Sequence, residues 1–285
     1  MIFNYYPNRK ISLIDYLKGF FVSKSKIYTL FLEEKIQING QKANNRSMLY
    51  KNDVVSIILE EKIDYKPVYA PLDIVYEDDY LLIINKPKGI IIHDDDKNKT
   101  TSLCNIVAGY YHNKGYDINV RFAHRLDYDT TGIIIFCKDI LTMSYMNHYI
   151  STHEVVREYR AFIKGKLKNN EGTINLPIAS DRHIANKMRV SNTGKEAISH
   201  YKVIKNYKDY SLLSVILETG RTHQIRVHFS HIGHPLLGDT LYGGDKRLID
   251  RVALHSFSVS FYHPILDENM YLKCELPNDM MGLGD

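Results

Sequence analysis

The run TGIIIFC, residues 131–137, limits the fold of this chain more than any other segment. It is apolar almost throughout and rich in β-branched residues, which predicts a strand buried inside a sheet. A charged cluster, AHRLDYDT, directly precedes this run, and Gly132 marks the turn between them. We therefore expect a rigid buried strand that holds a charged loop at its mouth.

Similar strand patterns recur along the chain, with Gly and Asn turns between them. Strands are predicted within residues 73–93, 157–167, 197–207 and 211–220. Helices are predicted at residues 141–151 and at 221–233, where Thr222 is the expected N-cap and Gly233 the expected end. Because strands outnumber helices, the predicted fold class is α+β, with a mixed, mostly antiparallel β-sheet and flanking helices.

The first 60 residues follow a different pattern. Apolar residues at helical spacing predict two short helices, the second with Ser23 or Ser25 as its N-cap. Asn39 and Gly40 predict a hairpin turn, and DVVSIILEE a closing strand. The predicted organisation is a small helix-helix-β-ribbon domain at 1–62, a linker at 63–70 and a second, larger domain at 71–285.

Positive charge is concentrated in the same N-terminal segment. Residues 1–60 contain nine Lys or Arg and five Asp or Glu, whereas the remaining 225 residues contain 28 of each kind. The formal net charge of +4 therefore lies entirely in the first fifth of the chain. This distribution favours a polyanionic partner for that domain. The alternative is an ordinary solvated lysine-rich surface.

Composition argues against several other classes of protein. No apolar stretch is long enough to span a bilayer, and charges stand where a secretory signal needs its apolar core. The three cysteines, Cys104, Cys137 and Cys274, are widely spaced. This spacing indicates reduced thiols in a cytoplasmic protein rather than a disulfide framework or a zinc site. Cys137 ends an apolar strand, so we expect it to be buried and inert.

Asp127 and Asp129 are the first candidates for chemistry. Two carboxylates can divide acid and base roles, as in glycosidases. Two aspartates in a surface turn are equally consistent with a purely structural role. A carboxylate on a rigid loop beside Arg125 stays ionised and can act as a nucleophile or a base.

The segment GRTHQIRVHFSHIGH, residues 220–234, is the second candidate. His228, His231 and His234 recur every third residue, a pattern that invites a zinc interpretation. Histidines at this spacing drift around a helix, and no carboxylate accompanies them. We therefore expect phosphate binding or a polar core here, and no metal.

Five ordered motifs over residues 70–265 resemble the RluA-type pseudouridine synthase family. They are KPKGIIIH, HRLDYDTTGIIIFCK, REYRAFIKG, TGRTHQIRVHFSHIGHPLLGDTLYG and RVALHSFSVSFYHP. The resemblance implies that Asp127 is the catalytic aspartate, Tyr159 the active-site tyrosine and Arg226 the partner of the catalytic carboxylate. Asp129 is then a turn residue. The remaining expected substrate contacts are His124, Arg125, Thr130, Arg221, His223 and Gln224.

Residues 10–60 resemble the alpha-L RNA-binding motif, which many RNA-modifying enzymes carry. The RNA-binding residues that this resemblance implies are Lys24, Lys26, Lys35, Lys42 and Arg46. Typical members have arginines where this chain has Lys24 and Lys26. Phosphate contact tolerates that change better than base recognition does.

Together the two resemblances imply an enzyme that isomerises specific uridines to pseudouridine in structured RNA. Large-subunit ribosomal RNA is the favoured substrate, and transfer RNA is the alternative. The reaction needs no redox step, so no cofactor is expected, and we expect a monomer without membrane association. On the residues alone, a metal-dependent hydrolase and a non-catalytic RNA-binding protein remain open.

Overall fold

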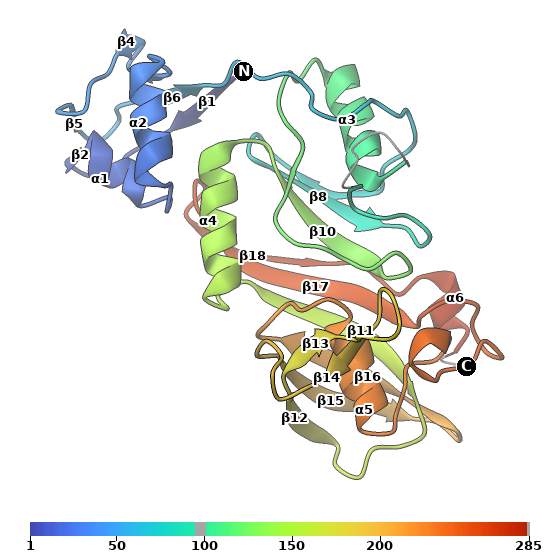
Figure 1. Ribbon diagram of the computed structural model, residues 1–285. Helices are drawn as coiled ribbons and strands as arrows, with labels where there is room; N and C mark the ends of the chain where they lie inside the picture. The colour runs from blue at the N-terminus through green and yellow to red at the C-terminus, as the bar shows by residue number, and fades with distance from the viewer. Residues whose placement is uncertain (95–100, 284–285) are drawn as a thin grey trace.

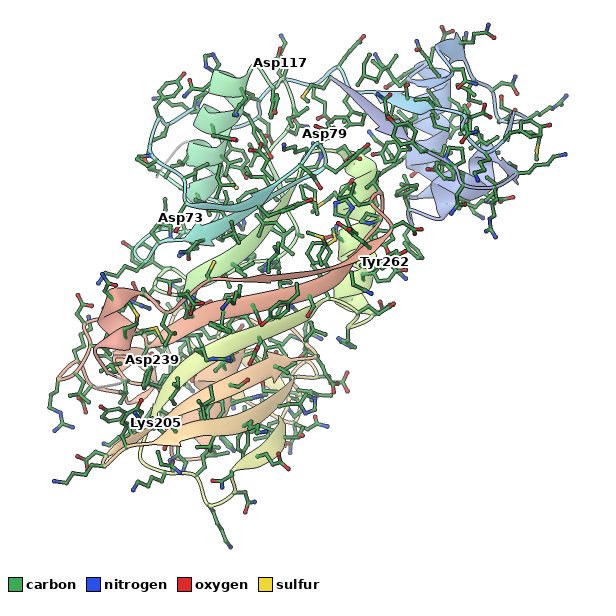
Figure 2. All side chains as sticks on the ribbon, turned by 180° about the vertical axis from the view of Figure 1, so that it is seen from behind. Asp73, Asp79, Asp117, Lys205, Asp239 and Tyr262 are labelled. Atoms are coloured by element: carbon green, nitrogen blue, oxygen red, sulfur yellow. The ribbon has the colours of Figure 1, made fainter. Side chains whose placement is uncertain are left out.

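A large β-sheet organises most of the chain (Figure 1). The computed structural model describes residues 1–94 and 101–283. In spatial order the main strands are β12 (Glu171–Asn175), β15 (Ile198–Asn206), β16 (Tyr210–Leu217), β11 (Val156–Lys164), β17 (Leu254–His263), β10 (Thr131–Cys137), β8 (Leu81–Lys86) and β7 (Ile74–Glu77). Two more strands join this sheet, β18 (Glu268–Lys273) beside β17 and β9 (Arg121–Phe122) beside β10. Seen from behind, the sheet extends from the region of Asp73 to that of Lys205 (Figure 2).

The predicted fold class is confirmed. Among the described strand pairs of this sheet, β10 and β17 run parallel and the others antiparallel. The flanking helices are α3 (Leu103–Lys114), α4 (Ile140–Ser151), α5 (Gln224–His231), the 3₁₀-helix η1 (Thr240–Tyr242) and α6 (Asn278–Met281). A separate hairpin, β13 (Ile178–Ser180) with β14 (Met188–Val190), stands beside α5.

Two of the helices begin differently from what the sequence pattern indicated. α3, which the sequence pattern did not predict, starts with a capping box between Ser102 and Asn105. α5 was predicted to be capped by Thr222, and this was wrong. His223 is the N-cap, in a left-handed conformation with φ of 56°, and its side chain makes no cap hydrogen bond. Gly233 follows α5 in a left-handed conformation, as expected for a helix end.

β10 is buried along its whole length, as predicted. At its start, Gly132 has a φ of +105°, and a Cβ at this position would lie 2.2 Å from the carbonyl oxygen of Ser256 in β17. Only glycine lets the two backbones approach this closely. The neighbouring Thr131 hydroxyl lies 2.8 Å from Nδ1 of His255, which also joins the two strands. The first residues of β10 are therefore held tightly against β17.

The N-terminal part is a small unit of its own. It contains β1 (Ile2–Tyr5), β2 (Ile11–Ser12), α1 (Leu13–Lys18), α2 (Lys24–Leu32), β3 (Ile36–Ile38), β4 (Gln41–Lys42), β5 (Met48–Leu49) and β6 (Val55–Ile58). Both helices were predicted, and Ser23 is the N-cap of α2. The first strand, β1, was not predicted, and it pairs with β6 at the edge of a four-stranded sheet.

The N-terminal unit is packed against the rest of the protein, beside α4 (Figure 1). The buried Tyr5 hydroxyl donates a hydrogen bond of 2.5 Å to Asp139, the N-cap of α4. The ring of Phe21 stacks on His148 of α4 with 3.5 Å between ring centroids. Residues 63–70 have no regular secondary structure, yet Tyr65 is buried and Val68 is hydrogen-bonded to Asn105 of α3.

We expect Gly132→Ala to lower the free energy of unfolding by about 2–4 kcal/mol, because it adds a steric clash to a strained φ. Gly40→Ala is the matched control, since Gly40 also has a positive φ (+78°) but nothing lies within 4 Å of its added Cβ. Urea unfolding of both variants measures the difference. Equal losses would mean that β10 and β17 can move apart at no cost.

Candidate active site

One cleft of about 1160 Å³ brings most of the predicted site residues together. Its walls come from the loop before β10, from the β13–β14 hairpin and from the segment that leads into α5. The C-terminal end of α4 also contributes, through residues 150 and 151. The loop runs directly into β10. The cleft therefore lies beside the charged loop that the sequence predicted at the start of a rigid strand.

Asp127 lies in this cleft and is held by Arg226 of α5. Nη1 of Arg226 donates to Oδ2 of Asp127 at 3.1 Å. The other side of the guanidinium is bound to Asp239, with Nε to Oδ2 at 2.7 Å and Nη2 to Oδ1 at 2.9 Å. Arg226 and Asp239 are 7% and 1% exposed, whereas the Asp127 side chain keeps 26% of its surface exposed. The buried guanidinium thus presents its remaining N–H group to a partly exposed carboxylate.

His223 approaches the same oxygen of Asp127. Its Nε2 lies 3.8 Å from Oδ2, and its Nδ1 lies 2.9 Å from the hydroxyl of Tyr242. Burial lowers the pKa of His223 below its usual value, although Asp127 opposes this shift. The imidazole is therefore neutral at neutral pH, and one of its nitrogens carries a single proton.

Tyr159 contributes a phenol to the cleft from β11. Its side chain is buried, and burial raises its pKa, with Asp127 adding to the effect and Arg157 opposing it. The hydroxyl consequently stays protonated at neutral pH. Tyr159 can offer its ring as a stacking surface and its hydroxyl as a donor, but it is not a phenolate base at rest.

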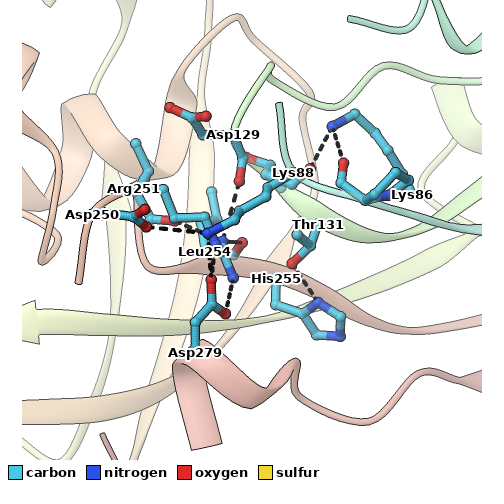
Figure 3. Close-up of polar contacts among 12 residues, drawn as sticks. Lys86, Lys88, Asp129, Thr131, Asp250, Arg251, Leu254, His255 and Asp279 are labelled. Carbon is cyan, nitrogen blue, oxygen red and sulfur yellow. Dashed lines mark hydrogen bonds and ion pairs between the residues drawn. The ribbon is translucent and has the colours of Figure 1, made fainter. Parts of the chain in front are cut away.

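A buried lysine holds the loop that carries Asp127. Lys86, at the end of β8, is fully buried, and its ammonium group donates to the carbonyl oxygens of Pro87, Tyr128 and Thr130, each at 2.9 Å (Figure 3). Burial lowers the pKa of Lys86 to about 7, while Asp129 and Asp127 act in the opposite direction. Three carbonyl acceptors match the three hydrogens of an ammonium group, so the geometry suits the charged form.

A buried arginine, Arg251, binds the same loop at the residue that follows Tyr128. Nη1 of Arg251 donates to the carbonyl oxygen of Asp129 at 3.1 Å. Its Nε and Nη2 bind both carboxylate oxygens of Asp279 in α6, each at 2.8 Å (Figure 3). Lys86 and Arg251 therefore fix three consecutive carbonyl groups, those of residues 128–130. Asp129 itself participates through its main chain, which agrees with the expectation that it is a turn residue.

The remaining predicted substrate contacts fall into two groups. Arg125 and Arg221 are exposed on the cleft, and His223 faces it. His124 lines the cleft but is buried, and burial lowers its pKa to about 3, so it is neutral. Thr130 is also buried.

Gln224 is better described as a structural residue than as a substrate ligand. Its Oε1 accepts from Thr219 Oγ1 at 2.8 Å and from the backbone N–H of Arg221 at 2.9 Å. Its Nε2 donates to the carbonyl oxygen of Ile198 and to Ser199 Oγ, both at 3.0 Å. These four hydrogen bonds saturate the amide within the protein.

The histidine run does not form a metal site. Nδ1 of the buried His228 lies 3.0 Å from Ser199 Oγ, and its Nε2 lies 2.9 Å from the carbonyl oxygen of Leu176. Nδ1 of His234 lies 2.9 Å from the carbonyl oxygen of Lys164. Within residues 1–94 and 101–283, no group of three or more His, Cys, Asp and Glu could hold a metal ion. Cys137 is buried, and burial raises the pKa of its thiol well above normal, as expected for an inert cysteine.

The predicted RNA-binding cations differ in their surroundings. Lys35 is paired with Glu60, and Lys42 with Glu34. Lys24 and Arg46 are exposed, and Lys26 is half-exposed in the first turn of α2. Lys24 and Lys42 also border a groove of about 580 Å³ between α2 and the segment around Asn44. None of the helices in the described part of the chain is long and apolar enough to cross a membrane.

The sequence pattern did not single out four residues that contact the side chains or backbone of the site without being predicted site residues themselves: Asp239, Tyr242, Lys86 and Arg251. Each lies inside one of the five motifs, so its position was visible. Its role was not visible, because it depends on contacts between segments far apart in the sequence.

A carboxylate held by a buried arginine in an open cleft suits an enzyme active site, and comparisons with known proteins identify the class of enzyme as RNA pseudouridine synthases. The model of the RNA pseudouridylate synthase family matches residues 80–231. The uncharacterized RNA pseudouridine synthase YhcT of Bacillus subtilis is 42% identical over 265 residues, which cover 92% of this chain and 88% of that protein. The ribosomal large subunit pseudouridine synthase D of Yersinia pestis is 35% identical, covering 92% of this chain and 85% of its own.

A solved structure supports the fold. Human RNA pseudouridylate synthase domain containing 4 superposes with a TM-score of 0.60 and 24% identity, covering 74% of this chain and 90% of that one. The chain belongs to the RNA pseudouridylate synthase family and is an RNA pseudouridine synthase of the RluA type.

We expect Arg226→Ala to lower the free energy of unfolding by about 3–5 kcal/mol, because it leaves the buried Asp239 without its counter-charge. Arg247→Ala is the matched control. Arg247 also makes a two-point pair, with Asp245, but its side chain is 80% exposed. Its loss is expected to leave the free energy of unfolding almost unchanged, because solvent screens an exposed ion pair. Similar denaturant midpoints for the two variants would contradict the structural role of Arg226.

Proposed function

We propose that this enzyme converts uridines of large-subunit ribosomal RNA to pseudouridine, with Asp127 as the catalytic group. The observation that carries the proposal is the partly exposed Asp127 carboxylate, held by a buried arginine inside the cleft. The name of the Yersinia pestis relative supports the choice of substrate. Asp127, Tyr159 and Arg226 all come from one chain, which agrees with a monomer, and three buried thiols suit the reducing cytoplasm.

The reaction exchanges one bond to the ribose for another. The bond between N1 of uracil and C1′ breaks, the base turns, and C5 joins C1′. The hydrogen on C5 is released to solvent and N1 gains a proton, so no oxidant or group carrier is required. Arg226 holds the Asp127 carboxylate in a fixed direction through a charge-assisted hydrogen bond, and the carboxylate then acts on the nucleoside as nucleophile or base.

The other cleft residues serve the base and its flanks. The base must first leave its stack, because its reactive atoms are covered in a folded RNA. Tyr159 stacks on the uracil through its neutral ring. Arg125, exposed on the same loop as Asp127, fills the gap that the base leaves or holds a neighbouring phosphate.

The N-terminal unit, residues 1–62, supplies additional RNA binding. Lys24, Lys26 and Arg46 are the cations that carry this contact, since ion pairs already engage Lys35 and Lys42. Lysines that meet phosphates release counterions, so this contribution is sensitive to salt.

Asp127→Asn is expected to abolish pseudouridine formation, because the amide keeps the shape but loses the charge. Asp129→Asn, the matched control, is expected to retain most activity. Cells without this gene are complemented with each variant, and pseudouridines are mapped in ribosomal and transfer RNA. Sites in large-subunit rRNA that depend on the gene support the proposal. Restoration by Asp127→Asn, or gene-dependent sites in transfer RNA alone, would contradict it.

Replacing Lys24, Lys26 and Arg46 together by Gln is expected to weaken binding of structured RNA at low salt. The log–log slope of affinity against salt should become shallower by about 2–3, as expected when three phosphate contacts are lost. The control replaces the paired Lys35 and Lys42 by Gln and should change the slope less. If the first variant keeps the wild-type affinity and slope, the basic surface does not bind RNA.

A further inference from the structure

Tyr242 lies behind the catalytic pair without reaching the substrate side of Asp127. It ends η1, three residues after Asp239, and it is 7% exposed. Its hydroxyl accepts a hydrogen bond of 2.8 Å from the backbone N–H of Met188, in the β13–β14 hairpin. The same hydroxyl lies 2.9 Å from Nδ1 of His223. One oxygen thus connects a wall of the cleft with a histidine beside Asp127.

Proton counting fixes the direction of the second hydrogen bond. Burial raises the pKa of Tyr242 to about 12, so the hydroxyl carries its hydrogen. The backbone N–H of Met188 is a donor and takes none of it. Within the described residues, the acceptor that lies within hydrogen-bond distance of this hydroxyl is Nδ1 of His223. Tyr242 therefore donates to Nδ1, and the proton of the neutral imidazole is placed on Nε2.

This tautomer matters because Nε2 is the nitrogen that faces Asp127, 3.8 Å from Oδ2. With a hydrogen on Nε2, His223 presents a positive N–H dipole to the same oxygen that Arg226 binds. With the hydrogen on Nδ1, it would present a lone pair and repel the carboxylate. The backbone supports the arrangement, since His223 holds a left-handed φ of 56°, a conformation that costs free energy and is retained where it serves the site.

The ring of Tyr242 has a second set of contacts. The guanidinium of Arg226 lies over it, 5.0 Å from the centroid. The ring also belongs to a small apolar cluster with Ile178 and Val227, against which Met188 packs. The ring therefore braces α5 against the hairpin, while the hydroxyl acts on His223, so the two contributions can be separated by substitution.

We propose that Tyr242 is a positioning residue for the isomerisation. Its hydroxyl sets the tautomer of His223 and so directs the Nε2 hydrogen toward Asp127. Because the same hydroxyl binds Met188, this tautomer is coupled to the position of the β13–β14 hairpin. Tyr242 acts through His223 and does not touch the nucleoside. The inference rests on the proposed catalytic role of Asp127. It concerns a residue that the sequence motifs alone did not single out.

Tyr242→Phe is the decisive variant, because it removes the hydroxyl and keeps the ring over Arg226. We expect kcat on a saturating RNA to fall about tenfold, the loss typical of one hydrogen bond, while KM stays within about twofold. In spectra of ¹⁵N-histidine-labelled enzyme, His223 should change from a pure Nε2–H tautomer to a mixture. A His223→Gln variant identifies its signals.

Tyr271→Phe is the matched control, since Tyr271 is 62% exposed on β18, and it should change neither readout. An unchanged His223 tautomer in Tyr242→Phe, or an unchanged kcat, overturns the proposal. A parallel loss of thermal stability and of activity, with the tautomer preserved, also overturns it, because Tyr242 would then be a packing residue. The tautomer of His223 is measured without turnover, so its result does not depend on which residue is catalytic. Activity in Asp127→Asn would refute the catalytic assignment of Asp127, whereas an unchanged tautomer in Tyr242→Phe would refute only the role of Tyr242.

Discussion

The buried guanidinium of Arg226 is the group on which the site depends. Asp239 occupies two of its nitrogens, Nε and Nη2, and thereby fixes the plane of the group. Only Nη1 is left to face the cleft, and Asp127 takes that position. A planar donor with fixed directions can do this, whereas a lysine ammonium could not hold two carboxylates in defined directions. The direction of the Asp127 carboxylate is therefore set by a guanidinium that the buried Asp239 fixes from behind.

The backbone of the loop that carries Asp127 is also restrained by buried cations. A tight turn at the start of β10 directs carbonyl oxygens away from any strand that could pair with them, and buried carbonyls need donors. Lys86 and Arg251 supply those donors, from β8 and from the segment before β17. Asp279 then neutralises Arg251, which connects the C-terminal helix to the loop. Buried cations on both sides leave Asp127 little freedom to move.

Sequence analysis succeeded where the signal is local. The apolar run of β10 and the alternation of β11 were sufficient to predict both strands. The ordered motifs singled out Asp127, Tyr159 and Arg226, and the structure brings these three residues together in one cleft. It failed where the outcome depends on distant partners. Lys35 meets Glu60, 25 residues away, so its ion pair could not be foreseen. α3 was not predicted because Asn, Gly and Tyr interrupt its apolar positions. The capping box between Ser102 and Asn105 was then the only remaining signal for this helix.

Packing between the two parts of the chain also limits how the N-terminal unit can be studied. Tyr5 donates to the buried Asp139, which in turn accepts from the first backbone N–H groups of α4. Burial raises the pKa of Asp139, and the hydrogen bond from Tyr5 opposes that shift. The far end of α4 lines the catalytic cleft. Deleting residues 1–60 would thus remove a donor from a buried carboxylate and uncover His148, so a loss of activity would not measure RNA binding. Substitution of exposed cations leaves these contacts intact and isolates the electrostatic contribution.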